Sequence, residues 1–281
     1  MRMPTFFFYI KLLRPLNIIT SGLAMLIGSS ILNTDNIEWE TALLISAIVM
    51  CYTAAANALN DALDFKIDLI NRPTRPIPAG HVKINTALII SFVLFCIGAF
   101  LCMQLSDTAK MIGIIIAIPL MVIYSTLLKT KPLIGNITVA LILGMSFLFC
   151  GSAHGNIEPM WLPMWLAFGL TLVRELVKDI ADIEGDRFVG ISTYPIVAGL
   201  DRSIHLSIFL SILIGVGSIQ PYFNGTYGIR YAILLILGVE IPLAIVVFLF
   251  LYNPGISSAI KGARVLKFST LMGLIAIYAG R

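Results

Sequence analysis

Long apolar segments follow one another along the whole chain and are separated by short polar loops. An apolar segment of about 20 residues crosses the hydrocarbon core of a bilayer as an α-helix. The pattern predicts nine such helices, at residues 14–33, 41–63, 86–105, 109–128, 133–152, 160–181, 204–222, 230–251 and 262–280. We therefore expect an all-α, polytopic membrane protein, with one domain over residues 1–281 and nine transmembrane helices around a central cavity.

The composition supports the same interpretation. Of the 281 residues, 58% are hydrophobic and only 12% are charged, and the mean hydropathy is +0.95. A soluble domain carries about twice that share of charge, so the surface of this chain must largely face lipid. The chain has no basic stripe or aromatic-spaced run of Lys and Arg, which excludes nucleic acid as a partner. Pro119 and Pro242 lie inside predicted spans and indicate kinks.

The positive charges are distributed unequally between the two sides of the predicted bundle. Nine spans place the N-terminus and the even-numbered loops on one side, and all 19 lysines and arginines except Lys110, Arg230 and Arg281 fall there. Cytoplasmic loops carry the excess of Lys and Arg, so this side is predicted to face the cytoplasm. We expect the protein to lie in the plasma membrane.

The second predicted span runs into an acidic cluster at its cytoplasmic end. Asn60 or Asp61, Asp64 and Asp68 recur at three- to four-residue intervals and would share one face of a helix. Carboxylates stacked in this way repel one another, and a divalent cation would relieve that repulsion. Oxygen ligands without His or Cys favour a hard ion, and Mg²⁺ typically binds a few carboxylates together with substrate phosphates.

The sixth predicted span ends in a second acidic cluster, with Glu184 predicted to point away from it. The residues on its shared helical face are Glu175, Asp179, Asp182 and Asp186. Two such faces suggest two metal ions that grip a polyphosphate from opposite sides. The nearby Arg174 and Lys178 would neutralise the rest of its charge.

Acidic residues of a membrane protein can also have roles other than metal binding. An isolated acid at a helix end is usually solvated, and this is how we interpret Glu158 and Glu240. A cation-coupled transporter also uses intramembrane carboxylates, but near the midplane of discontinuous helices. Here the carboxylates lie at one end of the bundle, beside basic residues that suit an anion. This placement favours phosphate binding, and a transporter is the alternative from another class.

These motifs resemble the UbiA superfamily of intramembrane prenyltransferases. Its NDxxDxxxD motif is similar to Asn60-Asp61-xx-Asp64-xxx-Asp68, and its DxxxD motif to Asp182-xxx-Asp186, here extended by Asp179. The segments 124–129 and 132–136 look like the family's middle segment, and the loop 71–80 is similar to the stretch after its first motif. The matches follow the family's order across most of the chain, and nine helices is the family's number.

The resemblance implies a Mg²⁺-dependent prenyltransferase that takes a prenyl group from its diphosphate. It implies metal ligands at Asp64, Asp68, Asp182, Asp186 and Asn60, and assistance from Asp61 and Asp179. It makes the following residues candidates to bind the diphosphate donor: Arg14, Arg72, Tyr124, Lys129, Arg174 and Lys178. Charge neutralisation of a departing diphosphate lowers the barrier to breaking the allylic C–O bond.

Two segments of the chain narrow the choice of acceptor. Residues 71–80 and 174–196 are most similar to the branch of the family that makes archaeal ether lipids. The branch implies geranylgeranyl diphosphate as donor and geranylgeranylglyceryl phosphate, a membrane lipid, as acceptor. An aromatic or tetrapyrrole acceptor of quinone or chlorophyll biosynthesis is the alternative. A phosphorylated acceptor needs further basic groups, and those available are Lys66, Arg75, Lys83 and Arg187, which could equally serve only the cytoplasmic charge bias.

Overall fold

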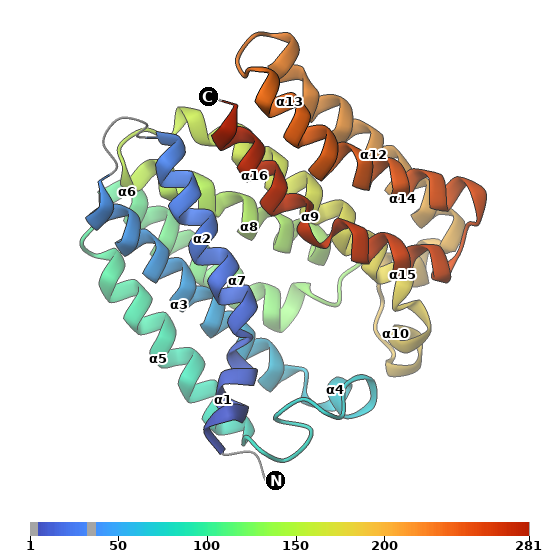
Figure 1. Cartoon of the computed structure of the whole chain (residues 1–281). Coiled ribbons are helices and arrows are strands. Elements are labelled where there is room, and N and C mark those ends of the chain that lie inside the picture. The colour runs from blue at the N-terminus through green and yellow to red at the C-terminus, as the bar shows by residue number, and fades with distance from the viewer. Residues whose placement is uncertain (1–4, 33–37, 281) are drawn as a thin grey trace.

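The computed structural model describes residues 5–32 and 38–280, in which helices pack side by side as a bundle (Figure 1). Within these residues, eight helical segments are long and apolar enough to cross a membrane. They are α2 (Pro15–Leu32), α3 (Trp39–Leu63), α5 (Ile84–Cys102), α6 to η2 (Asp107–Leu128), α8 (Ile134–Ala153), η3 to α9 (Glu158–Ala181), α12 (Leu200–Phe223) and α13 to α14 (Ile229–Tyr252).

The predicted boundaries of these eight spans agree with the structure to within four residues. Residue 33 of the first predicted span, Arg2 and Arg281 lie outside the described residues. Large apolar side chains such as Phe92 and Phe100 project from the bundle, at 69% and 74% exposure. Such an apolar exterior requires lipid as its solvent. The chain is therefore an integral, multi-pass membrane protein.

The predicted number of nine continuous helices is not confirmed. The ninth predicted span, 262–280, falls on three elements, namely α15 (Ile256–Val265), the 3₁₀ turn η5 (Leu266–Phe268) and α16 (Ser269–Ala279). The helical segment 256–279 carries Lys261, Arg264 and Lys267, and its helix changes type at η5. It still packs within the bundle, because α15 contacts α9 (Trp161–Ala181) and α14 (Ile241–Tyr252).

Two spans contain π-helical turns just ahead of the prolines for which kinks are predicted. The fourth consists of α6 (Asp107–Lys110), η1 (Met111–Ala117), α7 (Ile118–Ile123) and η2 (Tyr124–Leu128), and Pro119 follows η1. The eighth consists of α13 (Ile229–Leu235), η4 (Ile236–Glu240) and α14, and Pro242 follows η4. Proline clashes with the carbonyl one turn earlier, and a wider turn there accommodates the ring.

Glu240 is wrongly predicted to be solvated. It lies at the end of η4, near the middle of its span, and Ser218 Oγ donates a hydrogen bond of 2.5 Å to its carboxylate. Its side chain packs against α12, where a Cβ at Gly215 would lie 2.7 Å from Glu240 Oε2. The hydroxyl of Ser218 takes the place of water here. Glu158, at the start of the short 3₁₀ turn η3 (Glu158–Met160), is exposed as predicted.

Each acidic cluster lies where a long helix is interrupted. Helix α3 ends at Leu63, and α4 (Phe65–Asn71) starts one residue later, so Asp64 is at once the C-cap of α3 and the N-cap of α4. Asp182 occupies the same position between α9 and α10 (Ile183–Val189). The acidic residues therefore do not share one face of an unbroken helix, as the spacing predicted. Instead, α4 and α10 contact each other and lie at one end of the bundle (Figure 1).

The remaining short elements lie around this end of the bundle. Helix α1 (Thr5–Leu13) precedes α2, and α11 (Tyr194–Ala198) follows α10. The loop from 72 to 83 leads from α4 to α5. In the N-terminal half, α3 packs on α2 and α5, and in the C-terminal half α9 packs on α12, α15 and α16. The contact of α8 with α9 joins the two halves.

Candidate active site

A cavity of about 530 Å³ opens between the two acidic clusters. Its walls come from the joint of α1 and α2, the break between α3 and α4, η2, the start of α8, and the break between α9 and α10. Most of the predicted site residues line it, namely Arg14, Asn60, Asp64, Asp68, Arg72, Tyr124, Lys129, Lys178, Asp179, Asp182 and Asp186. Residues separated by more than a hundred positions in the sequence therefore face one space.

Two predicted site residues lie behind the cavity wall. Asp61 is only 2% exposed and does not line the cavity. Arg174 also lies outside the lining, and its Nη1 donates to Glu175, a lining residue, at 3.1 Å. Neither side chain is placed to touch a molecule in the cavity, so each could act only through a neighbour.

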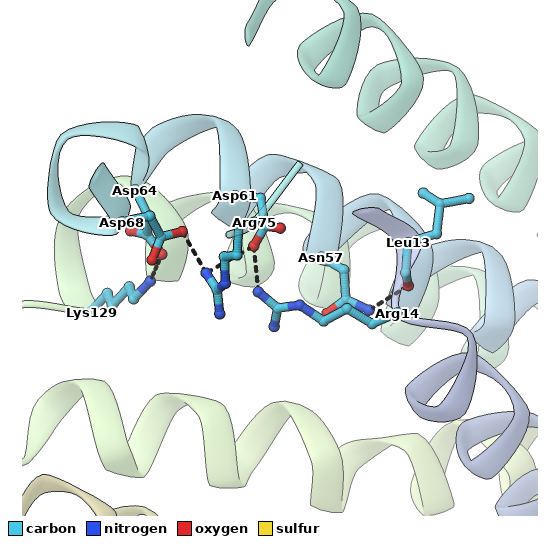
Figure 2. Close-up of polar contacts among 8 residues, drawn as sticks. All are labelled: Leu13, Arg14, Asn57, Asp61, Asp64, Asp68, Arg75 and Lys129. Atoms are coloured by element: carbon cyan, nitrogen blue, oxygen red, sulfur yellow. Dashed lines mark hydrogen bonds and ion pairs between the residues drawn. The ribbon is translucent and has the colours of Figure 1, made fainter. Parts of the chain in front are cut away.

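Every aspartate of the first cluster faces a cation (Figure 2). Arg75 Nη1 bridges two of them, at 3.1 Å from Asp61 Oδ1 and 2.5 Å from Asp68 Oδ2. Arg14 also pairs with Asp61, and Lys129 with Asp64. Burial raises the pKa of Asp68, whereas the hydrogen bond and charge of Arg75 oppose that rise. The carboxylates of this cluster are thus compensated within the chain.

The backbone holds Arg14 in an unusual conformation. Its φ of 55° lies in the left-handed region, between the end of α1 and Pro15, the first residue of α2. A non-glycine residue adopts this conformation only when its surroundings enforce it. Asn57 Nδ2 donates to the carbonyl of Leu13 at 3.0 Å and fixes the chain just before Arg14. The joint of the two helices thereby directs the guanidinium toward Asp61, as Figure 2 shows.

The loop that carries Arg75 is held by α1 and by a small apolar cluster. Lys11 Nζ donates to the carbonyl of Thr74 at 3.1 Å, next to Arg75. Behind the loop, a buried cluster joins α1, α3 and α5 to the loop, and its members are Leu12, Ala58, Ala62, Ile77, Val82 and Ala87. The ring of Phe8 stacks on His81 with centroids 3.6 Å apart. These contacts fix the position of Arg75 at the cavity.

The second cluster has a different set of partners. Asn136 Nδ2 donates to Asp179 Oδ2 at 2.8 Å, and Lys178 Nζ pairs with Glu175 at 2.8 Å. Among the described residues, no cation lies within ion-pair distance of Asp182 or Asp186. Burial raises the pKa of Asp186 to about 6, and the charge of Asp182 adds to the rise.

The structure corrects the prediction for Glu184 and distinguishes among the four basic residues whose role was left open. Glu184 lines the cavity although it was predicted to point away, because α9 is interrupted at Asp182 and the helical spacing does not continue through it. Of the four basic residues considered for a phosphorylated acceptor, only Arg75 lines this cavity, and its Nη1 is already shared by two aspartates. The other three, Lys66, Lys83 and Arg187, are exposed and lie outside the lining.

Some lining residues were not assigned to the site from the sequence. Lys131 and Asn71 contribute a cation and an amide, Thr193 a hydroxyl, and Asn136 the hydrogen bond to Asp179. The signal for Asn136 was available, because it is a polar residue near the start of an apolar span. No comparable pattern marks Thr193, which reaches the cavity only through the turn after α10.

The lining offers ligands that suit Mg²⁺. Asn60 Oδ1 is buried and has no hydrogen-bond partner within residues 5–32 and 38–280, so it is free to accept a hydrogen bond or to bind a cation. Asp64, Asp68, Asp182 and Asp186 also line the cavity. The described residues contain no group of three His, Cys or acidic side chains already gathered closely enough to hold a metal ion. The set therefore fits an ion that takes a few carboxylates from each side and completes its shell with phosphate oxygens and water.

A polar cavity between two acidic motifs, lined by cations and enclosed in a membrane bundle, defines a membrane enzyme that handles a polyphosphate. Residues 21–271 match the UbiA prenyltransferase family, and the chain belongs to that family. The predicted family and the prediction of a prenyltransferase are thereby confirmed. The match covers both acidic motifs and the segment between them.

Similar proteins share nearly the whole chain. Digeranylgeranylglyceryl phosphate synthase from Methanosphaera stadtmanae is 33% identical over 97% of this chain and 98% of its own length. A solved structure of digeranylgeranylglyceryl phosphate synthase in membranes has a TM-score of 0.82 and 31% identity, and covers 99% of both chains. A UbiA homolog from Archaeoglobus fulgidus bound to GPP and Mg²⁺ has a TM-score of 0.70 at 15% identity, covers 96% of this chain and 99% of that one, and shares the fold.

Proposed function

We propose that this protein transfers a geranylgeranyl group from geranylgeranyl diphosphate to the free hydroxyl of geranylgeranylglyceryl phosphate, with Mg²⁺, in ether-lipid biosynthesis. The observation that carries the proposal is the cavity that gathers both acidic motifs and six cations in one membrane bundle, namely Arg14, Arg72, Arg75, Lys129, Lys131 and Lys178. The similarity to digeranylgeranylglyceryl phosphate synthases over nearly the full chain supports the choice of donor and acceptor.

In the reaction, the allylic C–O bond of the donor breaks, and the acceptor oxygen forms the new ether bond and loses its proton. Mg²⁺ bound by Asn60, Asp64, Asp68, Asp182 and Asp186 would neutralise charge on the leaving diphosphate. The chain's own cations add to this neutralisation. Arg72 and Lys131 line the cavity and have no ion-pair partner among the described residues, so both are available to phosphate oxygens.

The allylic carbon needs protection from water once its bond to oxygen weakens, because water would capture the developing cation. Tyr124 in η2 is the aromatic residue of the cavity lining. An aromatic face stabilises a nearby cation. We assign Tyr124 to this role, and Ile67 and Val139 to the apolar part of the lining that limits water.

In the direct test, purified protein is incubated with Mg²⁺, radiolabelled geranylgeranyl diphosphate and one of several acceptors, which are assayed in parallel. The acceptors are geranylgeranylglyceryl phosphate, its phosphate-free alcohol, and an aromatic quinone precursor. We expect diphosphate release and a product with the mass of digeranylgeranylglyceryl phosphate. A product formed only with the aromatic acceptor would replace the proposed acceptor by the alternative from quinone biosynthesis. Ion flux in proteoliposomes without any diphosphate release would support a transporter instead.

We further propose that the cavity faces the cytoplasm and that the membrane is the plasma membrane. The excess of Lys and Arg at the loops beside the acidic motifs supports this orientation. A cysteine introduced at the exposed residue Thr74 should be protected from a membrane-impermeant maleimide in intact cells and labelled after lysis. Labelling in intact cells would reverse the orientation.

A further inference from the structure

Helix α15 and the turn η5 carry three positive charges along one face of the bundle. Lys261, Arg264 and Lys267 are spaced by three residues, and all three side chains are exposed. The opposite face of the same segment, with Ser258, Ala259, Gly262 and Leu266, is buried. The segment is therefore a packed helix of the bundle with one charged outer face.

The contacts of two glycines show how deep these charges lie. A Cβ at Gly262 would lie 3.2 Å from Val246 of α14 and 3.5 Å from Val177 of α9. A Cβ at Gly273 would lie 2.7 Å from Leu166, much further along α9. Lys267 lies between Gly262 and Gly273 in the sequence, so its level along α9 is between those of Val177 and Leu166. With a rise of about 1.5 Å per residue, its Cα lies about 13 Å from the end of α9, well within the length of the span Glu158–Ala181.

The described part of the chain supplies no counter-charge for these three cations. There, Lys261 and Arg264 make no hydrogen bond or ion pair through their side chains, and Lys267 makes only a cation–π contact with Phe268, 5.5 Å from the ring centroid. The neighbouring helices α14 and α16 contain no charged residue. On α9, Glu175 pairs with Arg174 and Lys178, and Asp179 accepts from Asn136.

Unpaired cations at this depth need an anion or water, because a charged side chain in lipid is costly and ionisable residues there mark functional sites. The long side chains of Lys and Arg can extend toward the interface, but their charge then lies at the level of lipid headgroups. The same face exposes Ile260 and Phe268, at 40% and 59%. A face that combines three cations with apolar side chains matches an amphipathic molecule with an anionic head and a hydrocarbon tail.

We propose that this face of α15 and η5 is the docking surface for the acceptor, whose phosphate headgroup the three cations hold before it reaches the cavity. The inference rests on the proposed function for the identity of the acceptor. The surface is separate from the diphosphate-binding cavity, because no residue of α15 or η5 lines that cavity. It is nevertheless close, because Gly262 lies beside Val177, two residues before Asp179.

The test measures the KM values for donor and acceptor in the wild type, in single variants and in a triple variant of the three cations. We expect Lys267→Gln to raise the KM for geranylgeranylglyceryl phosphate about fivefold, and the triple variant K261Q/R264Q/K267Q to raise it on the order of a hundredfold. The KM for geranylgeranyl diphosphate and the kcat at saturating acceptor should change less than twofold. Lys267→Arg, which keeps the charge, should have the same KM for the acceptor as the wild type.

A matched control is Arg202→Gln, since Arg202 is exposed at the start of α12 and has no ion pair among the described residues. It should leave both KM values unchanged. A second readout is the rise in unfolding temperature on adding acceptor, which needs no turnover. The wild type should be stabilised more by geranylgeranylglyceryl phosphate than by its phosphate-free alcohol, and the triple variant should lose that difference.

The remaining outcomes separate the docking surface from a general anion site and from the proposed function. Equal effects on the donor and acceptor KM, or an acceptor preference for phosphate that survives in the triple variant, would overturn the docking surface. Stabilisation by inorganic phosphate, or by phosphatidic acid as strongly as by the acceptor, that the triple variant loses would show an anion site without selectivity on α15 and η5 and would also overturn it. If the wild type gives no product from this acceptor yet is stabilised by it through these cations, the proposed function fails and the docking surface stands.

Discussion

The two acidic motifs share one backbone arrangement and differ in their electrostatics. In both, a long membrane helix stops at an aspartate, and a helix of seven residues continues from it. The backbones of Asp64 and Asp182 are nearly alike, with φ of −80° and −97° and ψ of 4° in both. The first motif, however, is paired with Arg14, Arg75 and Lys129, whereas Asp182 and Asp186 have no ion pair among the described residues.

This difference indicates how strongly each motif would bind a metal ion in the absence of the donor. At the first motif a metal ion must compete with cations of the chain, which approach the same oxygens. At the second motif the carboxylates repel each other and that of Asp186 is partly shielded from water, so a divalent cation relieves an existing cost. If the protein uses Mg²⁺ as proposed, the second motif would bind metal before the donor arrives. The first would bind metal together with the diphosphate, which offers Arg75 and Lys129 other oxygens.

The largest effect should come from removing a carboxylate of either motif. Asp64→Ala and Asp182→Ala should each lower the rate of prenyl transfer on the order of a thousandfold, because charge neutralisation of the leaving diphosphate supplies several kcal/mol. The measurement is product formation from radiolabelled donor at saturating Mg²⁺. Glu158→Ala, which removes an exposed acid outside the cavity, is the control and should keep full activity. Near-normal transfer by either Asp variant would refute a mechanism that needs both motifs.

The order of metal binding can be measured without any donor. Asp182→Asn should weaken the binding of Mn²⁺, a spectroscopic substitute for Mg²⁺, at least tenfold, because it removes one of few ligands. Asp64→Asn should weaken it less than threefold, since Lys129 already occupies that carboxylate. Titration followed by electron paramagnetic resonance gives both affinities. Equal losses in the two variants would show that the motifs do not differ in the way their ion pairs suggest.

The raised pKa of Asp186 leads to a pH dependence of metal binding. Because burial raises the pKa of Asp186 to about 6, this carboxyl is ionised at pH 7.5 and becomes protonated as the pH falls through 6. A protonated carboxyl cannot serve as a metal ligand, so the affinity for Mg²⁺ should fall about tenfold between pH 7 and pH 5. Asp186→Asn should bind weakly at both pH values. An affinity of the wild type that is flat down to pH 5 would contradict this role.

The smallest effect concerns the cation that bridges the first motif. Arg75→Gln should tighten metal binding at that motif about threefold, because one positive charge near Asp61 and Asp68 is removed. It should also lower the unfolding temperature, since buried Asp61 and Asp68 lose a partner. Mg²⁺ should then raise the unfolding temperature of the variant more than that of the wild type. Differential scanning fluorimetry with and without Mg²⁺ measures both, and identical shifts would argue against competition.

Much of the bundle could be predicted from the sequence, because lipid imposes a simple rule. Helices must satisfy their own backbone groups in the hydrocarbon core, so the length of an apolar run reports the length of the helix. Eight spans follow this rule closely. The ninth does not, because the charges at Lys261, Arg264 and Lys267 and the turn at η5 depend on what the segment contacts rather than on its mean hydropathy.

The composition of the site was partly predictable for the same kind of reason. Acidic residues at helix ends in an apolar chain are conspicuous, and eleven of the thirteen predicted site residues line the cavity, the exceptions being Asp61 and Arg174. Pairing was not predictable. Nothing in the spacing shows that Arg75 bridges Asp61 and Asp68, since that contact depends on how the loop after α4 folds back. The interruptions at Asp64 and Asp182 were not predictable either, because the helical periodicity of the sequence continues through both positions.

The position of Asp61 also has an evolutionary consequence. One buried oxygen of this residue receives guanidinium groups from two segments, Arg14 ahead of α2 and Arg75 in the loop after α4. A neutral residue at 61 would leave Arg14 without its ion-pair partner and Arg75 with Asp68 alone. Among homologous sequences, positions 14, 61 and 75 should therefore vary together, and lineages that lose the acid should also lose at least one of the two arginines.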